Sequence, residues 1–354
     1  MNRSVVVKHI EPVDKRVICI SDIHGDLDRY KALLEKVSYK PNADRLILLG
    51  DLIEKGPKNL ETLRYIMNQV RDEDVHCLMG NCDFTLKNVL FSYRLAFLKR
   101  VVSSRPSTVK EMAAEIGCDL DMDTGELCMR LREHFLPELT FVSDLPHVLL
   151  DGNRIYTHAA IMNETTFGSD FRETMTTPFF MNTDQSFSKP VVCGHLPVSE
   201  YCRQILSLEP VFDPKRSIWS IDGGNIVKEW GQLNALVFDG NETYTVSYDD
   251  LPEATVKNTV HPGVQIPFCL TFNHGDVEVL DEGEKQSYVH SPYLGRDFWM
   301  DTEFIRGGRG CDYTNWQMPL EKGDVVKVVR VFADKVYIKK NGRLGWAYRN
   351  DINL

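Results

Sequence analysis

The sequence lacks the features that mark secreted, membrane-inserted and disulfide-stabilised proteins. No apolar run is long enough to cross a membrane, and the first residues lack the apolar stretch of a signal peptide. The nine cysteines are odd in number and contain no Cys-x-x-Cys pair, which favours reduced thiols over a disulfide framework. We therefore expect a cytoplasmic protein that does not act on a membrane.

An excess of basic residues is also missing. The formal net charge is −10, so generic binding to nucleic acids, which needs a basic face, is not expected. The chain has no internal repeat and no low-complexity segment. Its 354 residues, 43% of them hydrophobic, are enough for two domains or for one enlarged domain with a sizeable core.

Three short apolar runs near the N-terminus each end in polar residues. The runs are Val17–Ile20, Arg45–Leu49 and Val75–Met79, and they are typical of strands buried on both faces. The polar residues that follow them include Asp22, His24, Asp51 and Asn81. Because open α/β sheets keep their sites at the C-terminal ends of strands, we expect these side chains to meet. Carboxylate, imidazole and amide together suit a divalent cation such as Mn, Fe or Zn.

The segments between and after these runs have the periodicity of helices. Apolar residues at helical spacing over 27–37 and 60–70 predict two helices, and hence a β-α-β-α-β unit with a mostly parallel sheet. The helical spacing then continues from Phe84 to Pro137, where a helix should end, and a capping box of Thr108 and Glu111 opens one helix. We interpret residues 84–140 as a helical insertion, which either shapes access to a site or is a plain structural layer.

Two later apolar runs also end in a histidine. His158 follows Ile155-Tyr-Thr, and His195 follows Val191-Val-Cys-Gly. A single histidine in such a place is more often a core residue than a ligand. Five such strand ends in one chain reverse that expectation, because together they offer six candidate ligands to one point.

The ordered motifs resemble those of the calcineurin-like metallophosphoesterases, and among them the phosphoprotein-phosphatase (Ser/Thr phosphatase) branch. The five blocks are Asp-Ile-His-Gly, Gly-Asp-Leu-Ile-Glu-Lys-Gly, Gly-Asn-Cys-Asp, Tyr-Thr-His-Ala-Ala and Cys-Gly-His-Leu-Pro. They occur in the family's order within residues 15–240, and the combination is highly specific although each block alone is weak. The resemblance implies an α/β fold, in which a metallophosphoesterase β-sandwich is flanked by helices.

The same resemblance implies two divalent metal ions, with Mn as the first expectation and Fe or Zn as alternatives. It places Asp22, His24 and Asp51 on one metal, and the bridging Asp51 with Asn81, His158 and His195 on the second. Such a centre hydrolyses phosphate esters by attack of a bound hydroxide, with no phosphoenzyme.

Three residues depart from the phosphatase branch within its reacting unit. Glu54 and Lys55 stand where that branch has Asp and Arg, and Cys82 stands where it has His. The Gly-Asn-Cys-Asp block is instead similar to one in small prokaryotic phosphodiesterases. The residues predicted to be catalytic are Asp51, Cys82 and Glu54, and those predicted to contact the substrate phosphate are Lys55, Asn81 and Arg172. Arg172 is equally compatible with the surface of a helix.

The C-terminal part of the chain is rich in strand patterns and turns. Asn341-Gly342 between two strand patterns is a strong hairpin signal. The segment from Glu321 to Ala347 resembles a small bacterial SH3-like β-barrel, for which we expect a structural or oligomerisation role. We therefore divide the chain into a metallophosphoesterase domain over residues 1–250, which includes the insertion, and a β-rich SH3-like domain over residues 251–354.

The leading prediction is a metallophosphoesterase, acting either as a phosphatase or as a phosphodiesterase or nucleotide hydrolase. A Ser/Thr protein phosphatase is the alternative within this class, and a non-catalytic scaffold of the same fold is the alternative outside it. The expected partner is a small phosphorylated substrate or nucleotide, with a phosphoprotein as an alternative, and an oligomer is compatible with the sequence. Retention of all six candidate ligands favours the enzyme over the scaffold.

Overall fold

The computed structural model describes residues 3–263 and 266–354, which fall into two compact units. Unit 1 comprises Met1–Pro197 and Pro210–Asp249, and unit 2 comprises Val198–Glu209 and Asp250–Leu354. Unit 2 thus includes a short segment from within the stretch that the sequence analysis assigns to the first domain. The division into two domains after residue 250 stays a prediction.

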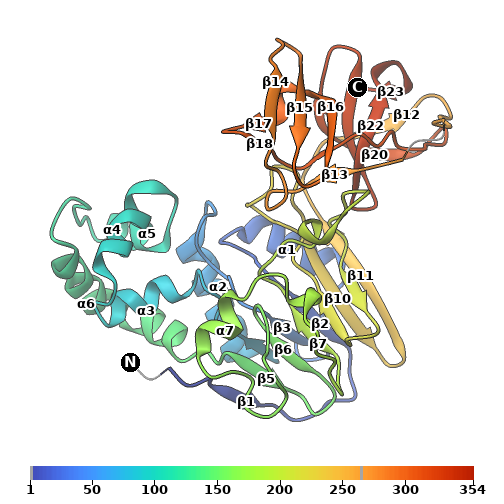
Figure 1. Ribbon diagram of the computed structural model, residues 1–354. Coiled ribbons are helices and arrows are strands. Elements are labelled where there is room, and N and C mark those ends of the chain that lie inside the picture. The colour runs from blue at the N-terminus through green and yellow to red at the C-terminus, as the bar shows by residue number, and fades with distance from the viewer. Residues whose placement is uncertain (1–2, 264–265) are drawn as a thin grey trace. The chain divides into compact units, whose positions relative to one another are not determined.

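Unit 1 is built on two β-sheets (Figure 1). One contains, in order across the sheet, β1 (Val7–His9), β5 (Val148–Leu150), β6 (Ile155–Thr157), β7 (Val191–Cys193), β9 (Ile218–Ser220) and β8 (Val211–Asp213). The other contains β11 (Glu242–Tyr248), β10 (Leu233–Asp239), β2 (Val17–Ile20), β3 (Arg45–Leu48) and β4 (Val75–Cys77). Strands β2, β3 and β4 are parallel to one another, as are β6, β7 and β9, so the ends of each set lie at one edge of its sheet.

Alternate residues of the central strand β2 show how the two sheets pack. Val17 and Cys19 belong to a buried cluster with Tyr156 of β6, so this face of β2 lies in the interior of a β-sandwich. Ile18 and Ile20 belong to the cluster on the opposite face, which is covered by helices. Because both faces are buried, every residue of β2 is apolar. The predicted α/β sandwich with flanking helices is confirmed.

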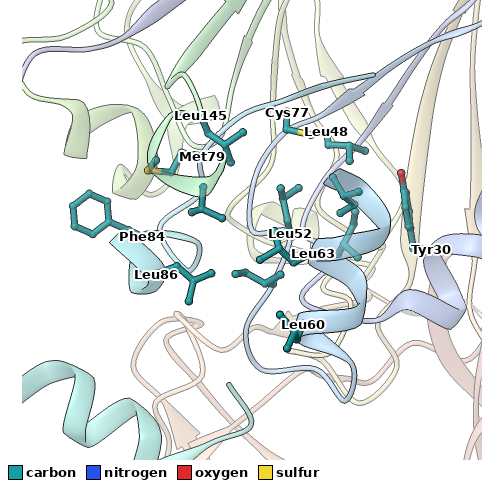
Figure 2. Packing of buried hydrophobic residues seen from close by; sticks show 14 of the residues in the cluster. Tyr30, Leu48, Leu52, Leu60, Leu63, Cys77, Met79, Phe84, Leu86 and Leu145 are labelled. Atoms are coloured by element: carbon teal, nitrogen blue, oxygen red, sulfur yellow. The ribbon is translucent and has the colours of Figure 1, made fainter. Parts of the chain in front are cut away.

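Two helices cover the outer face of the five-stranded sheet. They are α1 (Leu27–Lys36) and α2 (Asn59–Asp72), close to the predicted ranges. Figure 2 shows Leu60 and Leu63 of α2 in the buried cluster that also contains Leu48 of β3. Each helix begins a few residues after a loop that carries candidate ligands, so its packing anchors that loop.

The predicted helical insertion consists of four helices that lie together in unit 1 (Figure 1). They are α3 (Phe84–Leu90), α4 (Leu95–Ser104), α5 (Thr108–Glu115) and α6 (Thr124–Ser143). The predicted capping box is wrong, because α5 is capped one residue earlier, by Ser107, whose side chain accepts a hydrogen bond from the N–H of Lys110. The carboxylate of Glu111 instead accepts hydrogen bonds from the first two backbone N–H groups of α2.

Helix α6 also departs from the prediction, because it continues past Pro137 to Ser143. A proline inside a helix removes one backbone hydrogen bond, and its ring clashes with the preceding turn. The helix accommodates this with a kink at Phe135, whose φ of −123° and ψ of 28° are not helical. Leu131 and Leu139, on either side of the kink, are both buried in the same core.

The remaining helical segments are short. They are α7 (Phe171–Thr176) and the 3₁₀ turns η1 (Phe180–Asn182), η2 (Val198–Tyr201), η3 (Thr302–Phe304) and η4 (Arg349–Asp351). Within the described ranges, no helix is long and apolar enough to cross a membrane.

Unit 2 consists mainly of strands. Its largest sheet contains, in order, β22 (Arg343–Tyr348), β21 (Lys335–Lys340), β20 (Val325–Val331), β12 (Glu253–Val256) and β23 (Ile352–Asn353). Smaller sheets pair β13 (Cys269–Leu270) with β19 (Tyr313–Thr314), β17 (Ile305–Arg306) with β18 (Arg309–Gly310), and β15 (Gln286–Ser291) with both β14 (Glu278–Asp281) and β16 (Arg296–Asp301).

Two predictions concern the largest sheet of unit 2. The hairpin at Asn341-Gly342 is confirmed, since these two residues join β21 to β22 and have φ values of 48° and 66°. The same sheet has β22 and β23 as its two edges, and these strands do not pair in the part of the chain that the structure describes. A closed SH3-like barrel is therefore not shown.

Candidate metal centre

The ends of five strands of unit 1 carry the six predicted metal ligands. Asp22 and His24 follow β2, Asp51 follows β3, Asn81 follows β4, His158 follows β6 and His195 follows β7. The strands belong to both sheets of the sandwich, and their C-terminal ends bring these loops together.

Asp51 lies at the centre of the group. Its ligand atoms lie within 4.8 Å of those of Asp22 and His158. The Nε2 atom of His24 is 3.7 Å from Asp51 Oδ2 and 3.8 Å from Asp22 Oδ1, and His158 Nε2 is 3.5 Å from Asp51 Oδ1. Asp51 therefore faces one imidazole with each carboxylate oxygen, as a residue that bridges two cations must. All four residues are buried, with at most 2% of each exposed.

The main chain orients the histidine on the second side of Asp51. His158 Nδ1 donates a hydrogen bond to the carbonyl oxygen of Leu49 at 2.9 Å, so that Nε2 faces the site, 3.2 Å from the side-chain amide of Asn81. The ring centroid of His195 is 5.0 Å from that of His158. The backbone N–H of His195 donates a hydrogen bond to Asp22 Oδ2 at 3.0 Å. Because Asn81 and His195 are only partly buried, the site opens on their side.

The loops that carry the ligands adopt backbone conformations that are unusual for residues other than glycine. The φ values of Asp22, His24, Asp51 and His195 are 54°, 53°, 48° and 68°. Each such residue costs roughly 1–3 kcal/mol, and such strain clusters at functional sites. Gly80 packs so closely on Asp51 that a Cβ atom there would lie 2.1 Å from the Asp51 nitrogen. The close packing holds the strained loops in place.

Burial and crowding control the charges in this group. Burial, reinforced by Asp51, raises the pKa of Asp22 above its ordinary value. Burial also opposes the ionisation of Asp51, but the neighbouring His158 and His24 outweigh it and lower the pKa of Asp51. Burial lowers the pKa of His24 to about 3 and that of His195 to about 4, so both imidazoles are neutral at neutral pH. The neutral imidazole is the form that binds a metal.

These residues fit a centre of divalent cations. The donors are carboxylate oxygens, neutral imidazole nitrogens and an amide, a set that suits Mn, Fe or Zn. Asp22 Oδ1 is buried and has no hydrogen-bond partner among the residues that the structure describes. A cation next to Asp22 and Asp51 would satisfy this oxygen and remove the unfavourable contact between two buried carboxylates.

Lys55 brings a positive charge next to the ligands. Its Nζ atom lies 3.3 Å from His24 Nε2. Burial acts to lower the pKa of Lys55, but Cys82, Asp51 and Asp22 outweigh burial and raise it, so the side chain remains an ammonium. As a point charge it can neutralise a phosphoryl oxygen, although it lacks the two-pronged geometry of arginine.

Cys82 lies among the ligands, whereas Glu54 is directed toward the helical insertion. The Cys82 sulfur is within 4.8 Å of the ligand atoms of two predicted metal ligands, and burial raises its pKa well above the ordinary value, so it is a neutral thiol. Glu54 Oε1 accepts a hydrogen bond from the Thr108 N–H at 3.0 Å, and Glu54 Oε2 lies 3.5 Å from Arg105 Nη2. No hydrogen bond joins Glu54 to Cys82 in the described ranges.

Arg172 lies outside the cluster of ligands. It is the second residue of α7, its side chain is 59% exposed, and its guanidinium pairs with Asp170 at 2.6 Å and 2.9 Å. It does line a cavity together with Asn81. The structure therefore places Arg172 beside the open side of the site.

Asp83 is a residue of the site that the sequence analysis did not single out. This buried carboxylate accepts hydrogen bonds from the N–H groups of Leu52 and Ile53 at 2.9 Å and 3.2 Å, and from that of Gly80 at 2.8 Å. It thereby ties the loop after β3 to the loop after β4, and fixes the two ligands that these loops carry. The sequence feature that could have identified Asp83 is its place as the last residue of the Gly-Asn-Cys-Asp block.

Comparison with protein families bears on this geometry directly. The model of the calcineurin-like phosphoesterase family matches residues 15–205, more than half of the chain. The chain belongs to this family. Calcineurin-like phosphoesterases are hydrolases of phosphate esters that use a centre of two divalent metal ions, so the predicted family is confirmed, and the ligand cluster is a candidate for such a centre.

Relatives of this calcineurin-like phosphoesterase are found among curated proteins. The symmetrical bis(5'-nucleosyl)-tetraphosphatase of Pseudomonas fluorescens (strain Pf-5) is 46% identical over 67 residues, which are 19% of this chain and 22% of that protein. The protein of the same name from Pseudomonas syringae pv. syringae is 43% identical over 70 residues, 20% of this chain and 23% of that protein. The chain thus matches less than a quarter of the length of these relatives.

Solved structures give weaker similarities. A protein serine/threonine phosphatase from Saccharomyces cerevisiae superposes with a TM-score of 0.45 at 10% identity, over 74% of this chain and 86% of that chain. A cold-active protein tyrosine phosphatase from a Shewanella species superposes with a TM-score of 0.42 at 15% identity, over 68% and 78%. We draw no conclusion about substrates from these values.

Proposed function

We propose that this calcineurin-like phosphoesterase is a metal-dependent hydrolase of phosphate esters or anhydrides, with a nucleotide as its substrate. The observation that carries the proposal is the buried convergence of Asp22, Asp51 and His158, whose ligand atoms lie within 4.8 Å of one another. Two carboxylates buried together are costly unless cations accompany them. Membership of the family supports the same conclusion.

In this proposal the six predicted ligands hold two divalent ions, with Mn as the first candidate and Fe or Zn as alternatives. The ligands are Asp22, His24, Asp51, Asn81, His158 and His195, with Asp51 shared. When bound, the ions activate water at neutral pH and neutralise charge on the phosphoryl group. The hydrogen bond from His158 to Leu49 keeps Nε2 directed at Asp51, and the burial of these side chains excludes bulk water.

The residues around the ligands indicate the kind of leaving group. Cys82 remains a neutral thiol, which is a weaker proton donor than the imidazolium of the phosphatase branch. An aryl oxide, or the phosphate group that an anhydride releases, needs little proton donation as it leaves. A serine alkoxide needs much more. Glu54 then acts as a positioning residue, because it ties the loop of Lys55 to the insertion through Thr108. The arrangement thus favours nucleotide anhydrides and diesters with good leaving groups over phosphoserine.

The names of the relatives point in the same direction. Both Pseudomonas proteins are called bis(5'-nucleosyl)-tetraphosphatases, and the matches, although short, are 46% and 43% identical. We also propose, from the sequence analysis, a cytoplasmic location and a structural or oligomerisation role for an SH3-like unit 2. Size-exclusion chromatography with light scattering would test the oligomer.

The decisive experiment combines metal analysis with a panel of substrates. The purified protein is assayed with Mn, Fe, Zn and Mg on an aryl monoester, an aryl diester, a cyclic nucleotide, a dinucleoside polyphosphate and a phosphopeptide. We expect two bound metals and the highest kcat/KM on the dinucleoside polyphosphate or the diester. Metal binding without turnover on any substrate would instead support the scaffold, and a preference for the phosphopeptide would support a Ser/Thr phosphatase.

A further inference from the structure

A cavity of about 320 Å³ lies next to the candidate ligand Asn81. Its lining includes Arg3 from the N-terminal segment, Tyr93 and Arg94 from the insertion, and Arg172 from α7. We call it the arginine cavity. Because it borders the partly exposed ligand Asn81, a substrate bound at the ligands would extend into it.

The arginines of this cavity outnumber the carboxylate beside them. Asp170 pairs with Arg172 at 2.6 Å and lies 3.9 Å from Arg3 Nη1. The Arg94 guanidinium lies 4.5 Å from the ring centroid of Phe97, and it has no ion pair with a carboxylate in the ranges that the structure describes. Guanidinium groups match the oxygens of a phosphate with two parallel hydrogen bonds. The arginine cavity therefore suits phosphate groups of the substrate other than the one that is hydrolysed.

A second cavity, of about 490 Å³, adjoins the first, since both are lined by Tyr93 and Phe171. Phe91 and His147 also line it, and we call it the aromatic cavity. Phe91 is 55% exposed and Tyr93 is 44% exposed, although both are large aromatic side chains. Exposed aromatic rings next to a positively charged wall are typical of surfaces on which bases stack.

His147, which lines the aromatic cavity, carries a buried ring nitrogen without a partner among the described residues. Its Nδ1 accepts a hydrogen bond from the Val6 N–H at 2.9 Å. Burial, aided by Lys87, lowers the pKa of His147 to about 4, so the ring is neutral and its proton is on Nε2. This buried Nε2 atom has no hydrogen-bond partner among the described residues.

We propose that the two cavities together bind a nucleoside polyphosphate, with its phosphate chain in the arginine cavity and its base in the aromatic cavity. This inference rests on the proposed function, because the phosphate chain runs outward from the candidate metal centre at Asn81. It assigns substrate specificity to Arg94 and Phe91 of the helical insertion, two residues outside every motif of the family.

Isothermal titration calorimetry on the metal-free, full-length protein tests the phosphate half, with inorganic tripolyphosphate and ATP as probes. Arg94→Ala should raise the Kd of both probes about 10-fold, because a charge-assisted contact is lost. Arg100→Ala is the matched control, since Arg100 also lies against Phe97, at 5.6 Å, but is not among the lining residues. Equal Kd values for the two variants would overturn the arginine cavity as a phosphate site.

The binding of the base in the aromatic cavity is tested by comparing the two probes. They share three phosphates and differ in the nucleoside. Phe91→Ala should raise the Kd of ATP about 10-fold and leave that of tripolyphosphate at the wild-type value, because only ATP stacks. Met129→Ala, at an exposed apolar residue of α6, is the control. If Phe91→Ala changes the Kd of both probes equally, or of neither, the assignment of the base is wrong.

Turnover by the metal-loaded protein separates this inference from the proposed function. The ratio of kcat/KM for a dinucleoside polyphosphate to that for an aryl ester should fall about 10-fold in Arg94→Ala. If aryl esters are hydrolysed but neither this ratio nor the binding of tripolyphosphate depends on Arg94, the inference fails alone. If no ester or anhydride is hydrolysed while binding does depend on Arg94, the proposed function fails and the binding site stands.

Discussion

Two regions of unit 1 meet at Asn81 and are built in opposite ways. The loops that carry the ligands are mostly buried, hold strained backbone and follow strands that are mainly apolar. The arginine cavity instead has three exposed arginines, Arg3, Arg94 and Arg172, which come from segments that are far apart in the sequence. The comparison shows a division of labour. In our proposal, the sheet edge holds the chemistry, whereas the loops and helices around it select the substrate.

The largest effect should come from the centre of the buried region. We expect Asp51→Asn to abolish turnover and to weaken metal binding by more than about 100-fold, because outer partners of a metal ligand already contribute 10- to 100-fold. Metal content by mass spectrometry and kcat/KM on an aryl diester measure both effects. Asp28→Asn, on the exposed face of α1, is the control. If Asp51→Asn keeps normal turnover and binds two metals, Asp51 is not the shared ligand. The comparison between the two regions then loses its basis.

Glu54 lies where the ligand loop contacts the insertion. Its raised pKa should make the free energy of unfolding depend on pH. Burial raises its pKa from 4.5 to about 7, so the folded state disfavours the charged form. The free energy of unfolding of the metal-free wild type should fall, relative to Glu54→Gln, by roughly 3 kcal/mol as the pH rises from 4.5 to 7. Urea unfolding at several pH values measures this difference. Parallel profiles for the two proteins would contradict it.

A smaller effect should follow from loosening the buried region without touching a ligand. In Asp83→Asn, an amide N–H₂ group replaces one of the oxygens that accept backbone hydrogen bonds, so the loops after β3 and β4 lose a shared anchor. We expect metal affinity to fall by about 10- to 100-fold, with most of the free energy of unfolding retained. Titration with Mn gives the affinity, and circular dichroism checks the fold. Unchanged affinity would show that Asp83 has no positioning role.

The smallest effect concerns Cys82, which affects the choice of leaving group. Cys82→His introduces a stronger general acid, and Glu54→Asp can be added to hold the imidazole. We expect the ratio of monoesterase to diesterase activity to rise about 10-fold, at the low end of what a positioned acid contributes. The measurement is kcat/KM for paired aryl monoesters and diesters. An unchanged ratio with metals bound normally would assign the substrate preference to the cavities alone.

The sequence alone determined where the strand ends lie and which polar residues follow them. A strand buried on both faces, such as Val17–Ile20, must be a short run of apolar residues, and such a run can be recognised without a structure. The polar residues after it are therefore recognisable as well, as Asp22 and Asp51 were. The hairpin at Asn341-Gly342 was predictable for a similar reason, because its two positive φ values restrict the residues that fit.

Only the tertiary structure decided which side chains surround these loops. Glu111 binds the start of α2 rather than its own helix, and Asp83, at the end of the loop after β4, joins that loop to the loop after β3. Arg94 and Arg172 line one cavity although neither belongs to a strand end. Local periodicity records which face of an element is buried, but not which distant element packs there. The convergence of the candidate ligands was therefore predictable from the sequence, whereas the cavities beside them emerged only once the insertion and α7 were placed.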